Sequence, residues 1–207
     1  MPDQEQARER FSDDEATPAR KRPRPGERRL QILQTLAAML EQPGAERVTT
    51  AGLAAKIGVS EAALYRHFAS KAQMFEGLID FVDQSVTGLI RQVTDREPAG
   101  PVQVSRMVAL LLQFAEKNPG MSRVMVGDAL VLEHERLQER INLLFDKIEA
   151  QFRQSLKTSH SATPTADAQV TASLLVAFMQ GRLQRFARSG FKRLPSEHLQ
   201  AALGRML

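Results

Sequence analysis

The sequence contains no cysteine and no tryptophan, and it has a single tyrosine among its 207 residues. The absence of cysteine excludes disulfide bonds, thiolate nucleophiles and cysteine-bound zinc, and it agrees with a reducing cytoplasm. Aromatic residues make up only 5% of the chain, which favours helices because strands are enriched in aromatic and β-branched side chains. No apolar run approaches the ~20 residues that a membrane-spanning helix needs, and the N-terminus lacks the apolar core of a signal peptide. We therefore expect an all-α cytoplasmic protein without a membrane partner.

Sequence signals of catalysis and of cofactor binding are also missing. The chain has no G-x-S-x-G segment, no P-loop and no glycine-rich dinucleotide turn. Its histidines, at positions 67, 134, 160 and 198, show no spacing of the kind that holds a metal ion. We therefore expect a protein that is not an enzyme, with no catalytic residue, no metal and no cofactor.

The net charge of +4 is unevenly distributed along the chain. Residues 1–19 carry two basic and six acidic side chains, whereas residues 20–71 carry ten basic and four acidic ones. The rest of the chain is nearly balanced. A positive field confined to about fifty residues suggests a polyanionic partner for that part of the chain, although a basic solvated surface would give the same count.

The first 25 residues contain four prolines and almost no apolar side chains. Such a segment buries too little surface to fold, so we expect a disordered tail. It ends in the basic run 20–24, RKRPR. Runs of this kind often follow the phosphate backbone or enter the minor groove beside a major-groove reader. A basic linker is the alternative.

Three short helices are predicted in residues 26–70, which we expect to form a DNA-binding domain. The first spans about 27–41 and ends at Pro43-Gly44. Thr49 is a suitable N-cap for the second, which stops at Gly58, where a left-handed conformation is expected. Ser60 caps the third, which we expect to run to Phe68.

Two short helices joined through a glycine turn, with apolar residues only on their inner faces, predict a helix-turn-helix. The second helix of such a unit enters the major groove, where its small outward side chains allow close approach to the bases. Hydroxyl, tyrosine, histidine and lysine side chains around it suit phosphate contacts, and Arg66 also suits recognition of a guanine. The alternative is an ordinary corner in a helical bundle. The candidate DNA-binding residues are Thr49, Thr50, Ser60, Glu61, Ala63, Tyr65, Arg66, His67 and Lys71.

Residues 71–207 are predicted to form a larger helical domain for dimerisation and partner binding. Its first helix begins after Ser70, with Gln73 completing a capping box. Further helices are expected at about 102–118, 121–126, 129–157, 168–188 and 196–207, with a polar loop at 158–167. The helix at 168–188 is apolar, and its Gly181 is small enough to let a partner helix approach. We expect the dimer interface at Leu174, Phe178, Gly181, Leu199 and Leu203.

The segment Leu64-Tyr65-Arg66-His67-Phe68-x-Ser70-Lys71 resembles the signature of the TetR family. This resemblance covers the chain from about residue 27. It implies a helix-turn-helix head, a fourth helix that acts as a lever, and a helical body that dimerises through its last two helices. A two-fold dimer should read a palindromic site in double-stranded DNA.

Several stretches are similar to one branch of that family, the nucleoid occlusion factors. They include Asn118-Pro119-Gly120, Arg136-Leu137-Gln138-x-Arg140-Ile141-Asn142-x-Leu144-Phe145 and Arg188-Ser189-x-Phe191-Lys192. The resemblance implies a protein of the nucleoid that, when bound to chromosomal palindromes, disrupts assembly of the tubulin-like division GTPase FtsZ. It also implies a groove for the FtsZ tail between the fourth and fifth helices, with Phe81, Leu110, Lys117 and Asn118 as candidates. Phe81 and Leu110 also lie on apolar stripes, so a place in the core is the alternative for these two.

A TetR-type transcriptional repressor remains the alternative. In such a protein a small molecule enters a pocket between helices of the body and releases the DNA. Methionine side chains could line that pocket, although methionine more often fills gaps in a core.

Overall fold

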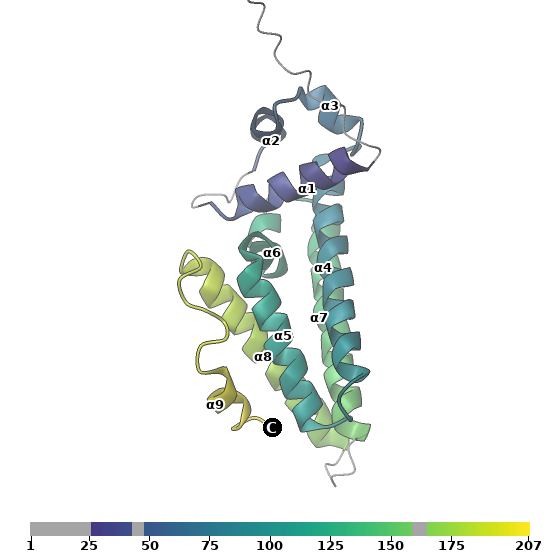
Figure 1. Ribbon diagram of the computed structural model, residues 1–207, viewed down its shortest axis with the longest axis vertical. Coiled ribbons are helices and arrows are strands. Elements are labelled where there is room, and N and C mark those ends of the chain that lie inside the picture. Colours follow the sequence, from purple (N-terminus) through teal and green to yellow (C-terminus); the bar gives the residue numbers. More distant parts are fainter. Residues whose placement is uncertain (1–25, 43–47, 159–164) are drawn as a thin grey trace, which may run out of the picture.

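A computed structural model gives the fold for residues 26–42, 48–158 and 165–207. Over these ranges the secondary structure is helical with no strand, which confirms the all-α prediction. Figure 1 shows a small group of helices set across one end of a long helical body. The tail and its basic run lie outside the described residues.

The small group, called the head below, consists of α1 (Glu27–Leu40), α2 (Thr50–Ile57) and α3 (Glu61–Tyr65). Gly58 ends α2 with φ 75° and ψ 42°, the left-handed conformation that glycine adopts without steric cost. The buried side chains of α1 and α2 form the inner side of the head, with Leu64 of α3 completely covered. The predicted helix-turn-helix topology is therefore present.

The third helix is shorter than predicted, because it ends at Tyr65 and not at Phe68. The amide of His67 donates to the carbonyl of Leu64 (2.9 Å), which tightens the chain into a turn. Ser70 must then be extended, with φ −155° and ψ 165°, to cap the next helix. The chain therefore leaves the helix before Phe68, whose ring still packs into the core at 1% exposure.

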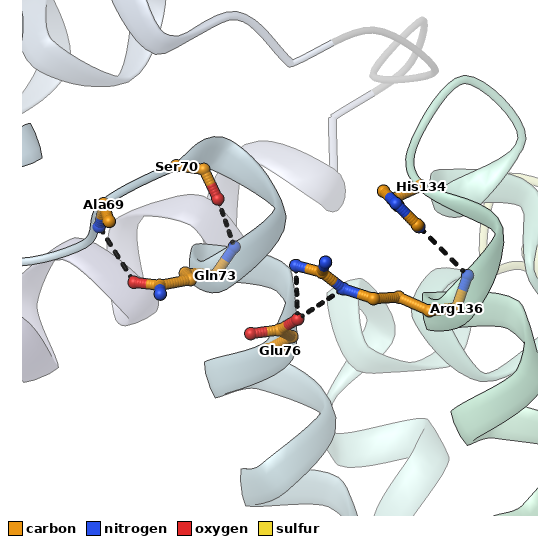
Figure 2. Close-up of polar contacts among 6 residues, drawn as sticks. All are labelled: Ala69, Ser70, Gln73, Glu76, His134 and Arg136. Carbon is orange, nitrogen blue, oxygen red and sulfur yellow. Dashed lines mark hydrogen bonds and ion pairs between the residues drawn. The ribbon is translucent and has the colours of Figure 1, made fainter.

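The body begins with α4 (Lys71–Thr94), α5 (Pro101–Lys117) and α6 (Pro119–Met125). The predicted capping box at the start of α4 differs in one bond. Ser70 Oγ accepts from the amide of Gln73 as expected, but Gln73 Oε1 accepts from the amide of Ala69 and not from that of Ser70 (Figure 2). The bond to Ser70 satisfies an amide that the helix start leaves without a partner, and the bond from Ala69 ties the residue before the cap to the first turn of α4.

The remaining elements are η1 (Asp128–Leu130), α7 (Glu135–Thr158), α8 (Thr165–Arg188) and α9 (Leu199–Leu203). The prediction of one helix from residue 129 to 157 was wrong at its start. Gly127 is left-handed (φ 83°), so the chain turns before α7, and His134 Nδ1 then accepts from the amide of Arg136 at 3.3 Å. The last helix is also shorter than the predicted 196–207.

Two contacts explain why α9 begins late. The amide of Ser196 donates to the carboxylate of Glu116 (2.6 Å), and the Arg182 guanidinium donates to the carbonyl of Glu197 (2.6 Å). These bonds hold the segment before α9 against α5 and α8. His198 follows with φ 54°, which breaks the helical path.

The head rests on the body where α1 crosses α6. Gly120 lies against the backbone of Ala37, so closely that a Cβ at position 120 would overlap the Ala37 carbonyl oxygen. Only glycine allows this approach. Figure 1 shows α4 running from the head along the body beside α7, so α4 is the covalent lever between the two parts.

Candidate functional site

Two of the predicted DNA-binding hydroxyls are helix caps. Thr49 Oγ1 accepts from the amide of Gly52 at 3.1 Å, and Ser60 Oγ accepts from the amide of Ala63 at 3.3 Å. Each cap satisfies an amide at the start of a short helix and fixes the direction of that helix. Thr49 and Ser60 are also exposed, so each hydroxyl is accessible to a phosphate while it caps its helix.

Thr50 and Glu61 bond to each other across the turn. Thr50 Oγ1 donates to Glu61 Oε2 at 2.6 Å, joining the first residue of α2 to the first residue of α3. A carboxylate repels phosphate oxygens, so Glu61 at the start of α3 would exclude the DNA backbone from that point. The bond therefore favours a role for this pair in setting the angle between the two helices.

The exposed end of α3 carries the side chains best suited to DNA. Tyr65 is 45% exposed, and Arg66 and His67 beside it are exposed, while the preceding Leu64 is buried. Ala63 is partly exposed and adds no bulk. We call Ala63, Tyr65, Arg66 and His67 the reading surface.

A positioning contact for this surface was missed from the sequence. Arg29 of α1 donates to the carbonyl of His67 at 2.6 Å, and its guanidinium lies 4.0 Å from the centre of the Phe68 ring. The positive charge of Arg29 therefore stabilises the turn that follows the C-terminal end of α3. No local pattern signals it, because the two residues are 38 positions apart.

Lys71 does not join the reading surface. Its ammonium pairs with the carboxylate of Glu133, in the loop before α7, and lies 5.7 Å from the centre of the Phe75 ring. The pair is largely covered, with the two side chains 28% and 11% exposed. In this structure Lys71 therefore ties the start of α4 to the loop before α7, and the phosphate contact expected of it stays a prediction.

The proposed groove residues lie on one side of α4 and α5. Phe81 is 46% exposed, although its place on an apolar stripe also allowed a core position. Its ring lies 6.4 Å from that of Phe114, and Leu110 is partly buried nearby in α5. Lys117 is exposed at the end of α5, whereas the Asn118 amide donates to the Phe114 carbonyl at 2.7 Å and so terminates the helix.

Leu110 also lines a cleft of about 480 Å³ between α4, α5 and α9. The cleft has an apolar floor from Val93 and Ala109, and two arginines, Arg96 and Arg106, contribute to its walls. These arginines could not be predicted as site residues from the sequence, because they are separated along the chain and match no motif. Arg106 lies 3.8 Å from Glu97, so one of the two positive charges is partly compensated.

The exposed side of α8 carries three of the residues predicted for the dimer interface, which stays a prediction. Leu174 is 57% exposed and Phe178 is partly exposed, with the Arg182 guanidinium 4.8 Å from the Phe178 ring centre. Nothing lies within 4 Å of the place where a Gly181 Cβ would be. A groove of about 410 Å³ runs beside Gly181 between α7 and α8. Val170, further along α8, is 58% exposed.

Leu199 and Leu203 do not belong to that face. They are 5% and 2% exposed and pack into the core of their own protomer. The prediction of these two residues as interface positions is therefore corrected. The amphipathic pattern of residues 199–206 marks an apolar face, but it does not say whether the same chain or a partner covers that face.

Within residues 26–42, 48–158 and 165–207, no three histidine or acidic side chains are grouped closely enough to hold a metal ion. None of the helices in the described part of the chain has the length and apolar content required to cross a lipid bilayer.

Two protein families match the chain. Residues 32–78 match the family described as bacterial regulatory proteins, tetR family. Residues 100–205 match the family described as tetracyclin repressor-like, C-terminal domain. The first match covers most of the head and the start of α4, and the second covers most of the body.

The chain is similar over most of its length to several curated proteins named nucleoid occlusion factor SlmA. The protein from Idiomarina loihiensis is 49% identical over 177 residues, which cover 84% of this chain and 90% of that protein. Those from Alteromonas mediterranea and Vibrio vulnificus are 47% and 48% identical over 173 and 177 residues. These matches cover 82% and 84% of this chain, and 89% and 90% of the respective relatives.

Solved structures confirm the fold. The ketosteroid transcriptional regulator KstR2 of Mycobacterium tuberculosis superimposes with a TM-score of 0.68 at 19% identity, covering 86% of this chain and 92% of that one. A TetR-like transcriptional regulator from Rhodococcus sp. RHA1 gives a TM-score of 0.67 at 18% identity, covering 89% and 97%. At these sequence identities the solved structures support the fold of this chain and no further conclusion.

Proposed function

This chain belongs to the SlmA family of nucleoid occlusion factors, a branch of the TetR family, and we propose that it acts as one. In this proposal a homodimer binds palindromic sites in chromosomal double-stranded DNA. The DNA-bound dimer then disrupts FtsZ assembly and so blocks septum formation over the nucleoid. The protein would accordingly work in the cytoplasm, associated with the nucleoid, and would not act as an enzyme.

One observation carries the proposal. The identity of 49% to a nucleoid occlusion factor extends over 177 residues, a length that must include most of the body as well as the head. In helix-turn-helix regulators the head recognises DNA, whereas partner specificity depends on the surface of the rest of the chain. Similarity that continues through the body therefore supports the specific function over a general regulatory one.

The head supports the DNA-binding half of the proposal. Tyr65, Arg66 and His67 are exposed on and just after a short helix whose start is fixed by the Ser60 cap. The small side chain of Ala63 allows that helix to approach the floor of the major groove. Arg66 then reaches either a guanine or a phosphate.

The surface formed by the candidate groove residues of α4 and α5 supports the second part of the proposal, the interaction with FtsZ. The half-exposed ring of Phe81 and the partly buried ring of Phe114 beside it offer apolar contact, and Lys117 at the end of α5 offers a positive charge. An apolar surface next to a cation suits a peptide that is both acidic and apolar. Leu110 joins this surface to the neighbouring cleft. Asn118 supports it by ending α5 and does not itself project as a free contact.

A transcriptional repressor that is released by a small molecule fits less well. The helical body of such a repressor should resemble in sequence the bodies of ligand-regulated repressors. Instead, the similarity to nucleoid occlusion factors extends through the body of this chain. A thermal-shift screen bears on this alternative, because an inducer that binds the folded state raises the melting temperature by mass action.

The substitution Lys117→Glu tests the proposal directly. It reverses a charge on the exposed end of α5, outside the reading surface, so DNA binding should remain at the wild-type level. Disruption of FtsZ polymers by the DNA-bound protein should fall by about ten-fold or more, because an acidic peptide would then meet a like charge.

Lys157→Glu is the matched control, since Lys157 is also exposed but lies near the end of α7. It should leave both DNA binding and FtsZ disruption unchanged. A Lys117→Glu protein that binds DNA and disrupts FtsZ as well as the wild type would remove the groove from the proposal.

A further inference from the structure

The segment 136–145 of α7 is one of those similar to nucleoid occlusion factors, yet it lies on neither the reading surface nor the FtsZ groove. Its basic residues face α4. The Arg136 guanidinium pairs with Glu76 at 2.8 Å, and that of Arg140 pairs with Asp80 at 2.6 Å. Figure 2 shows Arg136 reaching from the start of α7 to Glu76 on the first part of α4.

A third pair continues the series, because Lys147 lies 2.9 Å from Asp83. Every acid is on α4 and every base is on α7, and the pairs advance in the same direction along both helices. The two helices are therefore parallel. Lys71 and Glu133 form a fourth ion pair beside the head, in which the base is on α4 and the acid precedes α7. We call the three pairs Glu76–Arg136, Asp80–Arg140 and Asp83–Lys147 the ladder.

The other side of α7 faces a different element. Gln138, Asn142 and Phe145 line the groove that runs beside Gly181 of α8, on the face that we expect to meet the second protomer. The same stretch of helix thus contacts the lever on one side and borders the dimer interface on the other. Figure 1 shows α4 and α7 side by side below the head.

Resting on the proposed function, we infer that the ladder residues Arg136, Arg140 and Lys147 are positioning residues that set the distance between the two heads of the dimer. They hold α4 in one register and tilt against α7, and α7 borders the α8 face where we expect the two-fold axis. The ladder thereby determines which spacing of DNA half-sites the dimer accepts.

The length of the lever makes head spacing sensitive to small tilts. A helix of 24 residues is about 36 Å long, so a tilt of about 5° at its far end moves the head by about 3 Å. That displacement is close to the rise of one base pair, about 3.4 Å. A change too small to unfold the protein would therefore change the preferred spacing by about one base pair.

The ladder suits positioning better than bulk stability. Its side chains are between about a quarter and two-thirds exposed, and ion pairs at such sites stabilise a fold only weakly. Three pairs in sequence nevertheless favour one relative placement of two helices, because a shift or a tilt breaks them together. Loss of one pair should thus affect spacing discrimination more than folding.

The test measures binding to DNA duplexes that differ only in the spacing of the half-sites. The probes are a palindrome selected from random-sequence DNA by the wild-type protein, the same palindrome with one or two base pairs inserted at its centre, and a single half-site. The spacing ratio is the Kd for an inserted probe divided by the Kd for the original palindrome.

Arg140→Glu should lower the spacing ratio by about three-fold for each head, and hence by about ten-fold for the dimer. Its affinity for the single half-site should stay within about two-fold of wild type, because the reading surface is untouched. Combining Asp80→Arg with Arg140→Asp reverses the pair and should restore the ratio. Lys157→Glu, which reverses a charge on the same helix outside the ladder, should leave it unchanged.

An Arg140→Glu protein that is helical by circular dichroism but keeps the wild-type spacing ratio would overturn the inference and leave the proposed function standing. If that chain does not fold, Arg140→Gln replaces it. An unchanged ratio in Arg140→Gln overturns the inference equally. A wild-type protein that selects no DNA would overturn the proposed function, and the inference with it.

Discussion

Replacing Gly120 by alanine tests the contact that joins the head to the body. A Cβ at this position would overlap the carbonyl oxygen of Ala37 in α1. The neighbour is backbone, so it has no rotamer into which it can move. Relief requires α1 and α6 to separate by on the order of 1 Å, which weakens the dispersion contacts along the whole crossing.

Overpacking of this kind costs about 1–3 kcal/mol, and a backbone neighbour places Gly120→Ala near the upper end of that range. The intrinsic preference of helices for alanine recovers up to about 1 kcal/mol. The net destabilisation is therefore about 2 kcal/mol, which corresponds to a melting temperature lower by about 4–8 °C for a chain of this size.

Gly88→Ala is the control. Gly88 lies within α4, is exposed, and has nothing within 4 Å of the place where its Cβ would be. The same substitution should there stabilise the protein by about 0.5–1 kcal/mol. Thermal unfolding at one fixed protein concentration compares the two variants. If Gly120→Ala melts at or above the wild-type temperature, the close approach of α1 and α6 is not as described.

Three further outcomes are expected. Ser60→Ala removes the cap of the reading helix and should cost about 1 kcal/mol of stability, measured by urea unfolding; an unchanged midpoint would argue against the cap. Arg66→Ala should weaken DNA binding and, if the contact is to a phosphate, reduce the salt slope by about 1; equal affinity at every salt concentration would exclude Arg66 from the interface. Phe178→Asp should give monomers by light scattering, whereas Leu194→Asp, at an exposed apolar position outside the α8 face, should leave the dimer intact. A dimeric Phe178→Asp protein would refute the assignment of that face.

The head could be predicted from the sequence because its signals are local. Thr49 and Ser60 each accept a hydrogen bond from an amide three residues further along the chain, and Gly58 marks the turn between the two helices. Each of these features depends on a few adjacent residues. The end of α3 was the exception, since the extended conformation at Ser70 decides it.

Contacts between distant segments could not be predicted in the same way. Lys71 carries the charge and position of a phosphate contact, but its partner Glu133 lies 62 residues away. Leu199 and Leu203 have the spacing of an amphipathic helix, which is the same for a face that meets its own core and for one that meets another chain. Phe81 was ambiguous for this reason too, and its exposure became evident only once α5 was placed beside α4.

The start of α7 illustrates a third difficulty. The apolar periodicity continues back to Ala129, so it predicts one unbroken helix, while the chain forms η1 and then turns through residues 131–134 before α7 begins. The turn brings Glu133 to Lys71 and lets Arg136 and Arg140 face α4. Periodicity reports which side of a segment is apolar and not where the segment changes direction.

Sedimentation of FtsZ polymers tests the central claim most directly. FtsZ from the host bacterium is polymerised with GTP and pelleted in the presence of this protein, with and without a duplex carrying its selected palindrome. We predict loss of FtsZ from the pellet when the palindrome is present and little loss without it. Pelleted FtsZ that stays constant in both conditions, while the protein binds the palindrome, would contradict the account and leave a DNA-binding regulator of another kind.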